Sequence, residues 1–297
     1  MPTMRSTSTS VSPGPLARLF SPRVIRELGE TGTSRTGSEV LRESAFFPQG
    51  DQSLAVFLER AFHFLSTSLR SEYVFKNAIA EKILLGRHSF RTATMMTEFR
   101  AGTCKADVVI LNGHSTAYEI KSERDTMSRL DDQVMSYRKV FEQVVVVTDS
   151  CHLDEVFDRT PADVGITVLS DRYTLSEKRA PDIDWSRLDP CEMFESLQRS
   201  EYLKILALTS GWDPKGIPNG VLHREAKAAF HQVPIESLVP RFVDVLKHRG
   251  QRACPVAFLE SVPSSLKGLA VSTRLAPSQQ ERIMAALAIP AYCSLQY

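Results

Sequence analysis

The sequence predicts a mixed α/β fold, in which a β-sheet core is flanked by helices and followed by a helical C-terminal region. Three observations carry this prediction. Two strand-like segments between residues 105 and 122 are joined by Asn112-Gly113, a strong hairpin signal. Apolar residues then recur at helical spacing from 130 to 141. The four valines at 144–147 are typical of a strand that is covered on both faces.

The hairpin has two possible registers, and they place Asp107 differently. A two-residue loop would set Asp107 opposite Tyr118, whereas a three-residue loop at 112–114 would set it opposite Glu119. Directly opposed residues of antiparallel strands share one face of the sheet. Since Gly113 or Asn112 can take the positive φ that a longer turn needs, we predict an odd-length loop or a bulge, which places Asp107 on the face of Glu119 and Lys121.

The remaining elements follow from periodicity and from turn residues. Helices are expected at 54–65 and 73–85, a first core strand at 92–100, and a short helix and a buried strand at 152–158 and 165–169. Residues 172–187 are expected to form an edge hairpin or a loop that leaves the core. The C-terminal helices are expected at 190–209, 221–231, 235–249 and 277–289.

Composition bounds the class of protein. The chain has 297 residues, of which 42% are hydrophobic and 24% charged, values typical of a soluble globular protein. The net charge of +1 excludes a global electrostatic signal for nucleic acid, so any such surface must be local. Five scattered cysteines indicate a reducing compartment, and no apolar run reaches membrane-spanning length; we therefore expect a cytoplasmic protein. We expect a mostly disordered tail at 1–39, with a short helix at 16–29 left open, a domain at 40–184 that contains the sheet, and a helical domain at 185–297.

Asp107, Glu119 and Lys121 are the residues that carry chemistry. Charges on a strand face are often only solvated, and that is the simpler interpretation of any one of them. Together they match the needs of magnesium-dependent phosphodiester cleavage, because two carboxylates supply the oxygen ligands that Mg²⁺ prefers. A lysine on the same face can orient the attacking water, while the metal neutralises charge on the phosphate.

At these residues the chain resembles the PD-(D/E)XK nuclease superfamily, which has the restriction-endonuclease-like fold. Lys105-Ala106 stands where that signature has its proline. Gln133 and Tyr137, four apart on the expected helix, match the Gln-x-x-x-Tyr motif of the RecB and lambda-exonuclease branch. The resemblance covers roughly residues 50–180 and extends to a widespread, mostly uncharacterised bacterial family. It assigns the domain at 40–184 to a nuclease-like fold.

The resemblance implies a role for each matched residue. Asp107, Glu119 and the main-chain carbonyl of Ile120 would bind Mg²⁺ or Mn²⁺, and Lys121 would position the attacking water. Gln133 and Tyr137 would hold Lys121 or a DNA phosphate. Because Tyr137 also lies on the apolar stripe of its helix, a plain core role is the competing interpretation.

A third acid is expected from the helix that precedes the first core strand. Glu81 is the candidate, and a solvated glutamate paired with a neighbouring lysine is an equal alternative. Glu98, on the first core strand, ranks below Glu81.

The sequence therefore predicts a metal-dependent deoxyribonuclease that binds DNA, with phage defence or mobile-element biology as its setting. One alternative is a non-catalytic module that keeps the nuclease fold and binds nucleic acid or a protein partner. Another is an effector nuclease that a partner holds inactive. The sequence leaves open the choice between endonuclease and exonuclease, between DNA and RNA, and between a monomer and a homodimer.

Overall fold

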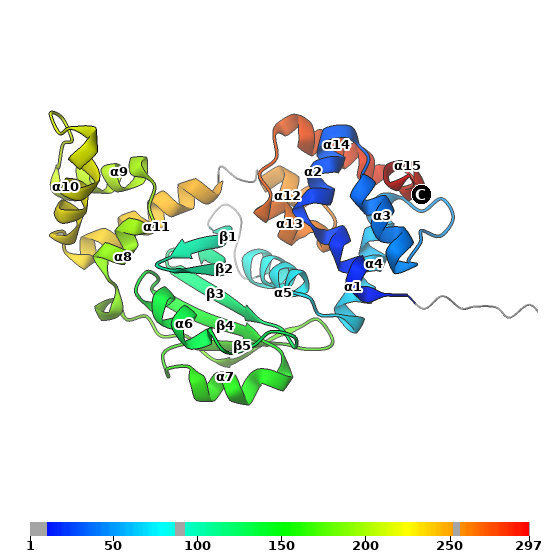
Figure 1. The fold of residues 1–297 in the computed structure, drawn as a ribbon, viewed down its shortest axis with the longest axis horizontal. Coiled ribbons are helices and arrows are strands. Elements are labelled where there is room, and N and C mark those ends of the chain that lie inside the picture. Colours follow the sequence, from blue (N-terminus) through cyan, green and yellow to red (C-terminus); the bar gives the residue numbers. More distant parts are fainter. Residues whose placement is uncertain (1–10, 87–92, 252–255, 297) are drawn as a thin grey trace, which may run out of the picture. The chain divides into compact units, whose positions relative to one another are not determined.

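The computed structural model describes residues 11–86, 93–251 and 256–296 of the chain (Figure 1). The chain divides into two compact units, one formed by Met1–Asn77 with Ala257–Tyr297 and the other by Ala78–Val256. This division differs from the predicted boundaries near residues 40 and 185. The first unit joins segments from the two ends of the chain, and local sequence patterns carry no signal of such a pairing.

The described residues of the first unit are helical. Its N-terminal part contains α1 (Pro13–Leu16), η1 (Ala17–Phe20), α2 (Pro22–Thr31), α3 (Arg35–Ser44), α4 (Leu54–Ser68) and α5 (Glu72–Ala78), which ends at the unit boundary. Its C-terminal part contains α12 (Val256–Ser261), η5 (Ser264–Leu266), α13 (Lys267–Ser272), α14 (Pro277–Ala288) and α15 (Ala291–Leu295).

The prediction of a mostly disordered tail at 1–39 is wrong for its described part, which forms helices. The helix considered for 16–29 corresponds to η1 and α2, and residues 1–10 lie outside the described residues. The side chains of Ser21 and Ser34 cap α2 and α3. Each hydroxyl accepts a hydrogen bond from the backbone N–H of the residue three positions later. Helix α2 packs on α14, where Arg282 Nη1 donates to the Gly29 carbonyl at 2.6 Å. The C-terminal segment thus supplies the apolar surface that orders these N-terminal residues.

The described residues of the second unit contain a six-stranded mixed sheet in which the strands lie in chain order. The strands are β1 (Thr94–Ala101), β2 (Cys104–Leu111), β3 (Ser115–Lys121), β4 (Gln143–Thr148), β5 (Gly165–Leu169) and β6 (Leu175–Arg179). Strands β1, β2 and β3 are antiparallel neighbours, β3, β4 and β5 are parallel, and β6 closes the sheet antiparallel to β5. The predicted mixed α/β core is therefore confirmed, with β6 as the edge strand expected within 172–187.

Helices flank this sheet and continue into the helical C-terminal region that the sequence predicts. They are η2 (Ile79–Leu85, a π-helix), α6 (Leu130–Arg138), η3 (Ser150–His152), α7 (Leu153–Arg159), η4 (Trp185–Arg187), α8 (Pro190–Glu195), α9 (Arg199–Ser210), α10 (Asn219–His231) and α11 (Ile235–Gln251). One apolar core joins strands β1–β5 to α6 and α8–α11. A domain boundary at 185 would cut this core, which explains why the second unit runs on to Val256.

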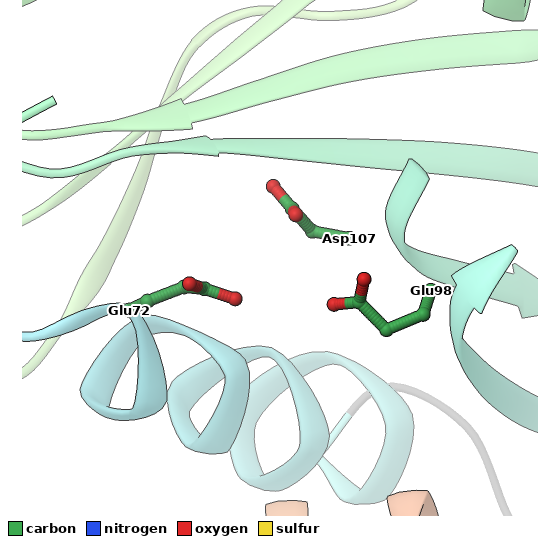
Figure 2. A group of neighbouring side chains, drawn as sticks. All are labelled: Glu72, Glu98 and Asp107. Atoms are coloured by element: carbon green, nitrogen blue, oxygen red, sulfur yellow. The ribbon is translucent and has the colours of Figure 1, made fainter. Parts of the chain in front are cut away.

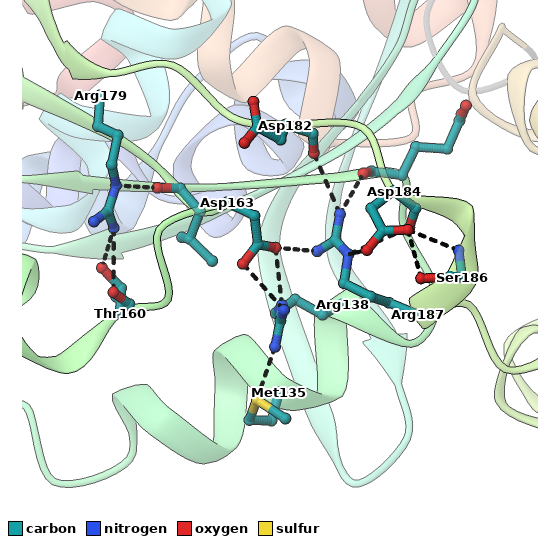
Figure 3. A network of polar contacts seen from close by, with 11 residues as sticks. Met135, Arg138, Thr160, Asp163, Arg179, Asp182, Asp184, Ser186 and Arg187 are labelled. Atoms are coloured by element: carbon teal, nitrogen blue, oxygen red, sulfur yellow. Dashed lines mark hydrogen bonds and ion pairs between the residues drawn. The ribbon is translucent and has the colours of Figure 1, made fainter.

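Helix α6 packs across β2, β3 and β4 and covers the face of β3 that carries Glu119 and Lys121 (Figure 1). A network of polar contacts holds the C-terminal end of α6 (Figure 3). Arg138 Nε and Nη2 donate to the two carboxylate oxygens of Asp163 at 3.1 and 3.0 Å, and Arg187 binds the same carboxylate. The network fixes the position of α6 over the sheet.

None of the helices in the described part of the chain is both long enough and apolar enough to span a membrane.

Candidate functional site

The β2–β3 hairpin has the predicted register. Leu111 pairs with Ser115, so residues 112–114 form a three-residue loop, and Gly113 within it has a φ of +103°. The recorded pairs continue to Val108 and Tyr118. Beyond these pairs, Asp107 Oδ2 accepts the backbone N–H of Ile120 at 2.7 Å, which joins the end of β2 to β3 beside Glu119. The three-residue loop is therefore observed, and the placement of Asp107 on the face of Glu119 and Lys121 stays a prediction.

Four of the predicted residues form one buried network beneath α6. Glu119 and Lys121 are only 2% and 5% exposed, and Lys121 Nζ lies 3.0 Å from Glu119 Oε1. Lys121 also donates to Gln133 Oε1 at 2.9 Å. Tyr137 donates its hydroxyl proton toward Glu119 Oε2 at 2.8 Å and toward the Lys105 carbonyl at 2.6 Å. The Gln-x-x-x-Tyr spacing thus sets both side chains of α6 on the charged pair of β3.

Burial dominates the electrostatics of this network. Desolvation raises the pKa of Glu119 above its usual range, although Lys121, Tyr137 and Gln133 all favour the carboxylate. Desolvation, and then the nearby Glu119 carboxylate, raise the pKa of Tyr137, which keeps it a hydrogen-bond donor. Tyr137 is fully buried, so the core role and the polar role that were considered for it coexist. Glu and Lys side chains are rarely buried to this extent unless they are paired, as these two are.

Asp107 faces a second acid, Glu98, at the sheet edge formed by β1 and β2. Figure 2 shows the two side chains as neighbours, and one carboxylate oxygen of each lies within 4.8 Å of the other. The third side chain labelled there, Glu72, belongs to the first unit, and the site is built from the second unit alone. Asp107 Oδ2 also accepts the backbone N–H of Ile120 at 2.7 Å, which ties the acid to β3.

Glu98 has an unusual backbone. Its φ is +54°, a left-handed conformation that costs a non-glycine residue about 1 kcal/mol. Strand pairing passes over Glu98, because Thr97 pairs with Val108 and Phe99 with Ala106. The kink turns the Glu98 carboxylate toward Asp107, and strain of this kind often accumulates where a side chain has a function.

Glu81 does not join these acids. Its carboxylate pairs with the adjacent Lys82 at 2.7 Å, as the alternative interpretation of Glu81 expected. In the described residues of the second unit, the close acidic pair consists of Glu98 and Asp107, and Glu119 is not part of that group. The ranking of Glu81 above Glu98 is therefore not supported by the geometry. The signal that could have favoured Glu98 is its place directly across from Asp107 in the β1–β2 register.

The model of the bacteriophage P4 protein cII family matches residues 66–265, which is more than half of the chain. The chain belongs to this family. The matched range contains every residue of the site just described.

A relative within the family shows how far the similarity extends. Protein cII of enterobacteria phage P4 is 40% identical to the chain over 62 residues, which are 21% of this chain and 24% of that protein. The chain thus matches about a quarter of that relative's length. No solved structure matches the chain.

The site opens into a cleft of about 650 Å³ in the cII-family region. The acids Glu98 and Asp107 line the cleft, and so does Gln133 of the α6 network. Its basic lining residues are Lys105, Arg129 and Lys139. A smaller cavity of about 460 Å³ shares Thr103, Ser136 and Lys139 with the cleft and extends it toward Arg100, Glu192 and Glu195. Asp107 therefore lines this cleft, whereas Glu119 and Lys121 are buried and do not line it.

Proposed function

We propose that this chain is a metal-dependent nuclease that hydrolyses phosphodiester bonds of DNA. The observation that carries the proposal is the buried Glu119–Lys121 pair, held by Gln133 and Tyr137 on the sheet face shared with Asp107. Charges on an ordinary strand face stay in solvent. Burying this pair instead costs the desolvation energy of both charges. The arrangement is also the one that resemblance to the PD-(D/E)XK superfamily led us to expect.

The donor set suits a hard divalent cation. Carboxylate oxygens of Glu98 and Asp107 already lie within 4.8 Å of each other at the cleft, and Mg²⁺ and Mn²⁺ favour such ligands. We propose Asp107, Glu119 and the Ile120 carbonyl as ligands, with Glu98 in the place first considered for Glu81. When bound, the cation would neutralise charge that develops on the phosphate and acidify a nearby water.

The side chains then divide the remaining work. Lys121 holds and orients the attacking water with its ammonium group, and Gln133 fixes that group in place through a 2.9 Å hydrogen bond. Tyr137 donates to Glu119 and keeps its carboxylate aimed along the sheet. Water attacks the phosphorus and gives up a proton to solvent, the bond from phosphorus to the leaving oxygen breaks, and the leaving oxygen takes up a proton from solvent.

The cations of the cleft support a polyanionic substrate. Within the described part of the chain, Lys105, Arg129 and Lys139 take part in no ion pair, so their charge is available to phosphate groups. The same lining includes the acids Glu98, Asp107 and Asp132, so these cations would attract DNA phosphates once a metal ion offsets the acids.

The proposal is tested with purified full-length protein on plasmid and linear DNA, in Mg²⁺, in Mn²⁺ and in EDTA. We expect cleavage with either metal and none in EDTA. Asp107→Asn and Lys121→Met should abolish cleavage, while Glu81→Gln, a matched loss of an acid outside the site, should cleave as the wild type does. Plasmid and linear substrates together distinguish endonuclease from exonuclease activity.

A second measurement addresses the metal directly. Mg²⁺ or Mn²⁺ should raise the Tm of the wild type by mass action, but not that of Asp107→Ala/Glu119→Ala. Wild-type protein that binds DNA and leaves it intact with both metals would refute the nuclease and favour the non-catalytic binding module. Equal metal-induced shifts in the wild type and the double variant would refute the metal site.

A further inference from the structure

The first unit has a cavity of its own, remote in sequence from the nuclease residues. Its volume is about 440 Å³, within the range of small-molecule sites. Helix α4 and the segment that precedes it form the walls, which include Phe46, Phe47, Arg60, His63 and Phe64. Three of these five residues are phenylalanines, and Phe47 is 43% exposed. The cavity therefore combines apolar walls with a single arginine.

The guanidinium of Arg60 is only partly satisfied. Nη2 donates to the Phe47 carbonyl, whereas Nε and Nη1 are buried and have no hydrogen-bond partner. The guanidinium carbon lies 4.9 Å from the ring centroid of Phe46 and 5.7 Å from that of Phe57, so two aromatic rings flank the cation. No carboxylate within the described residues forms an ion pair with Arg60.

This environment penalises the cation. Burial lowers the pKa of Arg60 from its usual value, although an arginine stays protonated in proteins. Buried donors without acceptors cost free energy, and the aromatic faces offset only part of that cost. An anion in the cavity would supply both the missing charge and the missing acceptors. Because neighbouring groups cover Nε and Nη1, an entering anion must turn the guanidinium toward the cavity to reach them.

We propose that this cavity binds a carboxylate attached to an aromatic or other apolar body. The carboxylate would accept hydrogen bonds from Arg60, while the apolar body packs on Phe46, Phe47 and Phe64. A planar carboxylate suits a guanidinium, and one arginine among aromatic walls favours a single negative charge over a polyphosphate. The site lies in the first unit and is independent of the proposed nuclease function.

The test is calorimetric titration of the full-length protein with 3-phenylpropionate and with its neutral analogue, 3-phenylpropionamide. The wild type should bind the acid and not the amide. Arg60→Met should weaken binding of the acid at least tenfold, as expected for loss of a charge-assisted hydrogen bond. Arg35→Met, which removes an arginine that is 88% exposed in the same unit, should leave binding unchanged.

Two further arms identify the source of the carboxylate and guard against a merely structural role. In the first arm, acetyl-Gly-Gly-Phe replaces 3-phenylpropionate, and its C-terminal amide replaces 3-phenylpropionamide. Tighter binding of the peptide acid would assign the site to a peptide C-terminus. Tighter binding of 3-phenylpropionate would assign it to a small molecule. The acid that binds should raise the Tm of the wild type and not that of Arg60→Met. No binding of either acid, or equal binding of acid and amide, would overturn the proposal.

Discussion

The charged pair beneath α6 allows a double-mutant cycle that separates function from stability. Lys121 Nζ and Glu119 Oε1 are 3.0 Å apart, with side chains 6% and 2% exposed. At an effective dielectric constant of roughly 20, their attraction is about 5 kcal/mol. Desolvating two ions costs several kcal/mol for each, so the net contribution of the intact pair is near zero. Removing one partner leaves the other charge buried and unpaired.

We therefore expect Lys121→Met to lower the free energy of unfolding by about 3 kcal/mol at pH 8, and Glu119→Gln by a similar amount. The double variant should lie within about 1 kcal/mol of the wild type, because the amide introduced at position 119 can still accept a hydrogen bond from Tyr137 and no charge remains. Urea unfolding followed by circular dichroism measures all four proteins. The double variant should be folded and unable to cleave DNA.

The pH dependence of the same variants gives an independent check. Because desolvation raises the pKa of Glu119 in the folded state, the native protein binds more protons than the unfolded chain above pH 4.5. This group's contribution to stability therefore falls as pH rises from 4.5 through the raised value, and Glu119→Gln removes that slope. Lys121→Met should steepen it. Single variants that each cost less than about 1 kcal/mol, with additive effects in the double variant, would refute the description of a buried, coupled pair.

Three other perturbations follow from single contacts. Glu98→Gly should unfold with about 1 kcal/mol more free energy than Glu98→Ala, since only glycine relieves the φ of +54°, and both should lose cleavage; equal stability in urea would contradict the strain. Glu27 should contribute to acid unfolding: although desolvation raises its pKa, hydrogen bonds from Thr36 and Ser34 lower it to about 2, so its contribution is present above pH 4.5 and is lost as pH falls toward 2. Thermal melts from about pH 6 to about pH 2 should show a weaker acid dependence for Glu27→Gln, and an unchanged one would argue against this role. Asp163→Asn should lower the free energy of unfolding by about 2 kcal/mol, because it removes the carboxylate that Arg138 and Arg187 share; a cost below about 0.5 kcal/mol in urea would show that the network does not hold α6.

The elements around the hairpin could be predicted because local and global signals agree there. Alternation placed Glu119 and Lys121 on one face, and the odd-length loop expected at Asn112-Gly113 is observed as a three-residue loop. The helical spacing of Gln133 and Tyr137 brought both side chains onto the charged pair. Short-range geometry is enough for such inferences, because a strand and a helix have fixed periods.

The errors arose where tertiary contacts decide the outcome. The segment at 13–44 has the composition of a tail, but it folds because α14 and α15, more than 200 residues away, pack against α2 and α3. Glu81 lies on a helix whose rotation about its own axis the sequence does not give, and its carboxylate turned to Lys82. Glu98 reaches Asp107 through a left-handed backbone that no propensity favours.

Some residues of this chain stabilise the fold, whereas others lower its stability. The elements that follow sequence rules, such as the capped helices and the valine strand, are those that stabilise the fold at low cost. Glu98, with its strained backbone, and Glu119 and Lys121, which are buried charges, all run against those rules within one site. Conflicts with local preference persist where another requirement maintains them, and here they converge on the face that Asp107 shares. If the double variant of Glu119 and Lys121 proves as stable as the wild type, stability cannot be that requirement, and the chemistry proposed for the site remains as the reason for the pair.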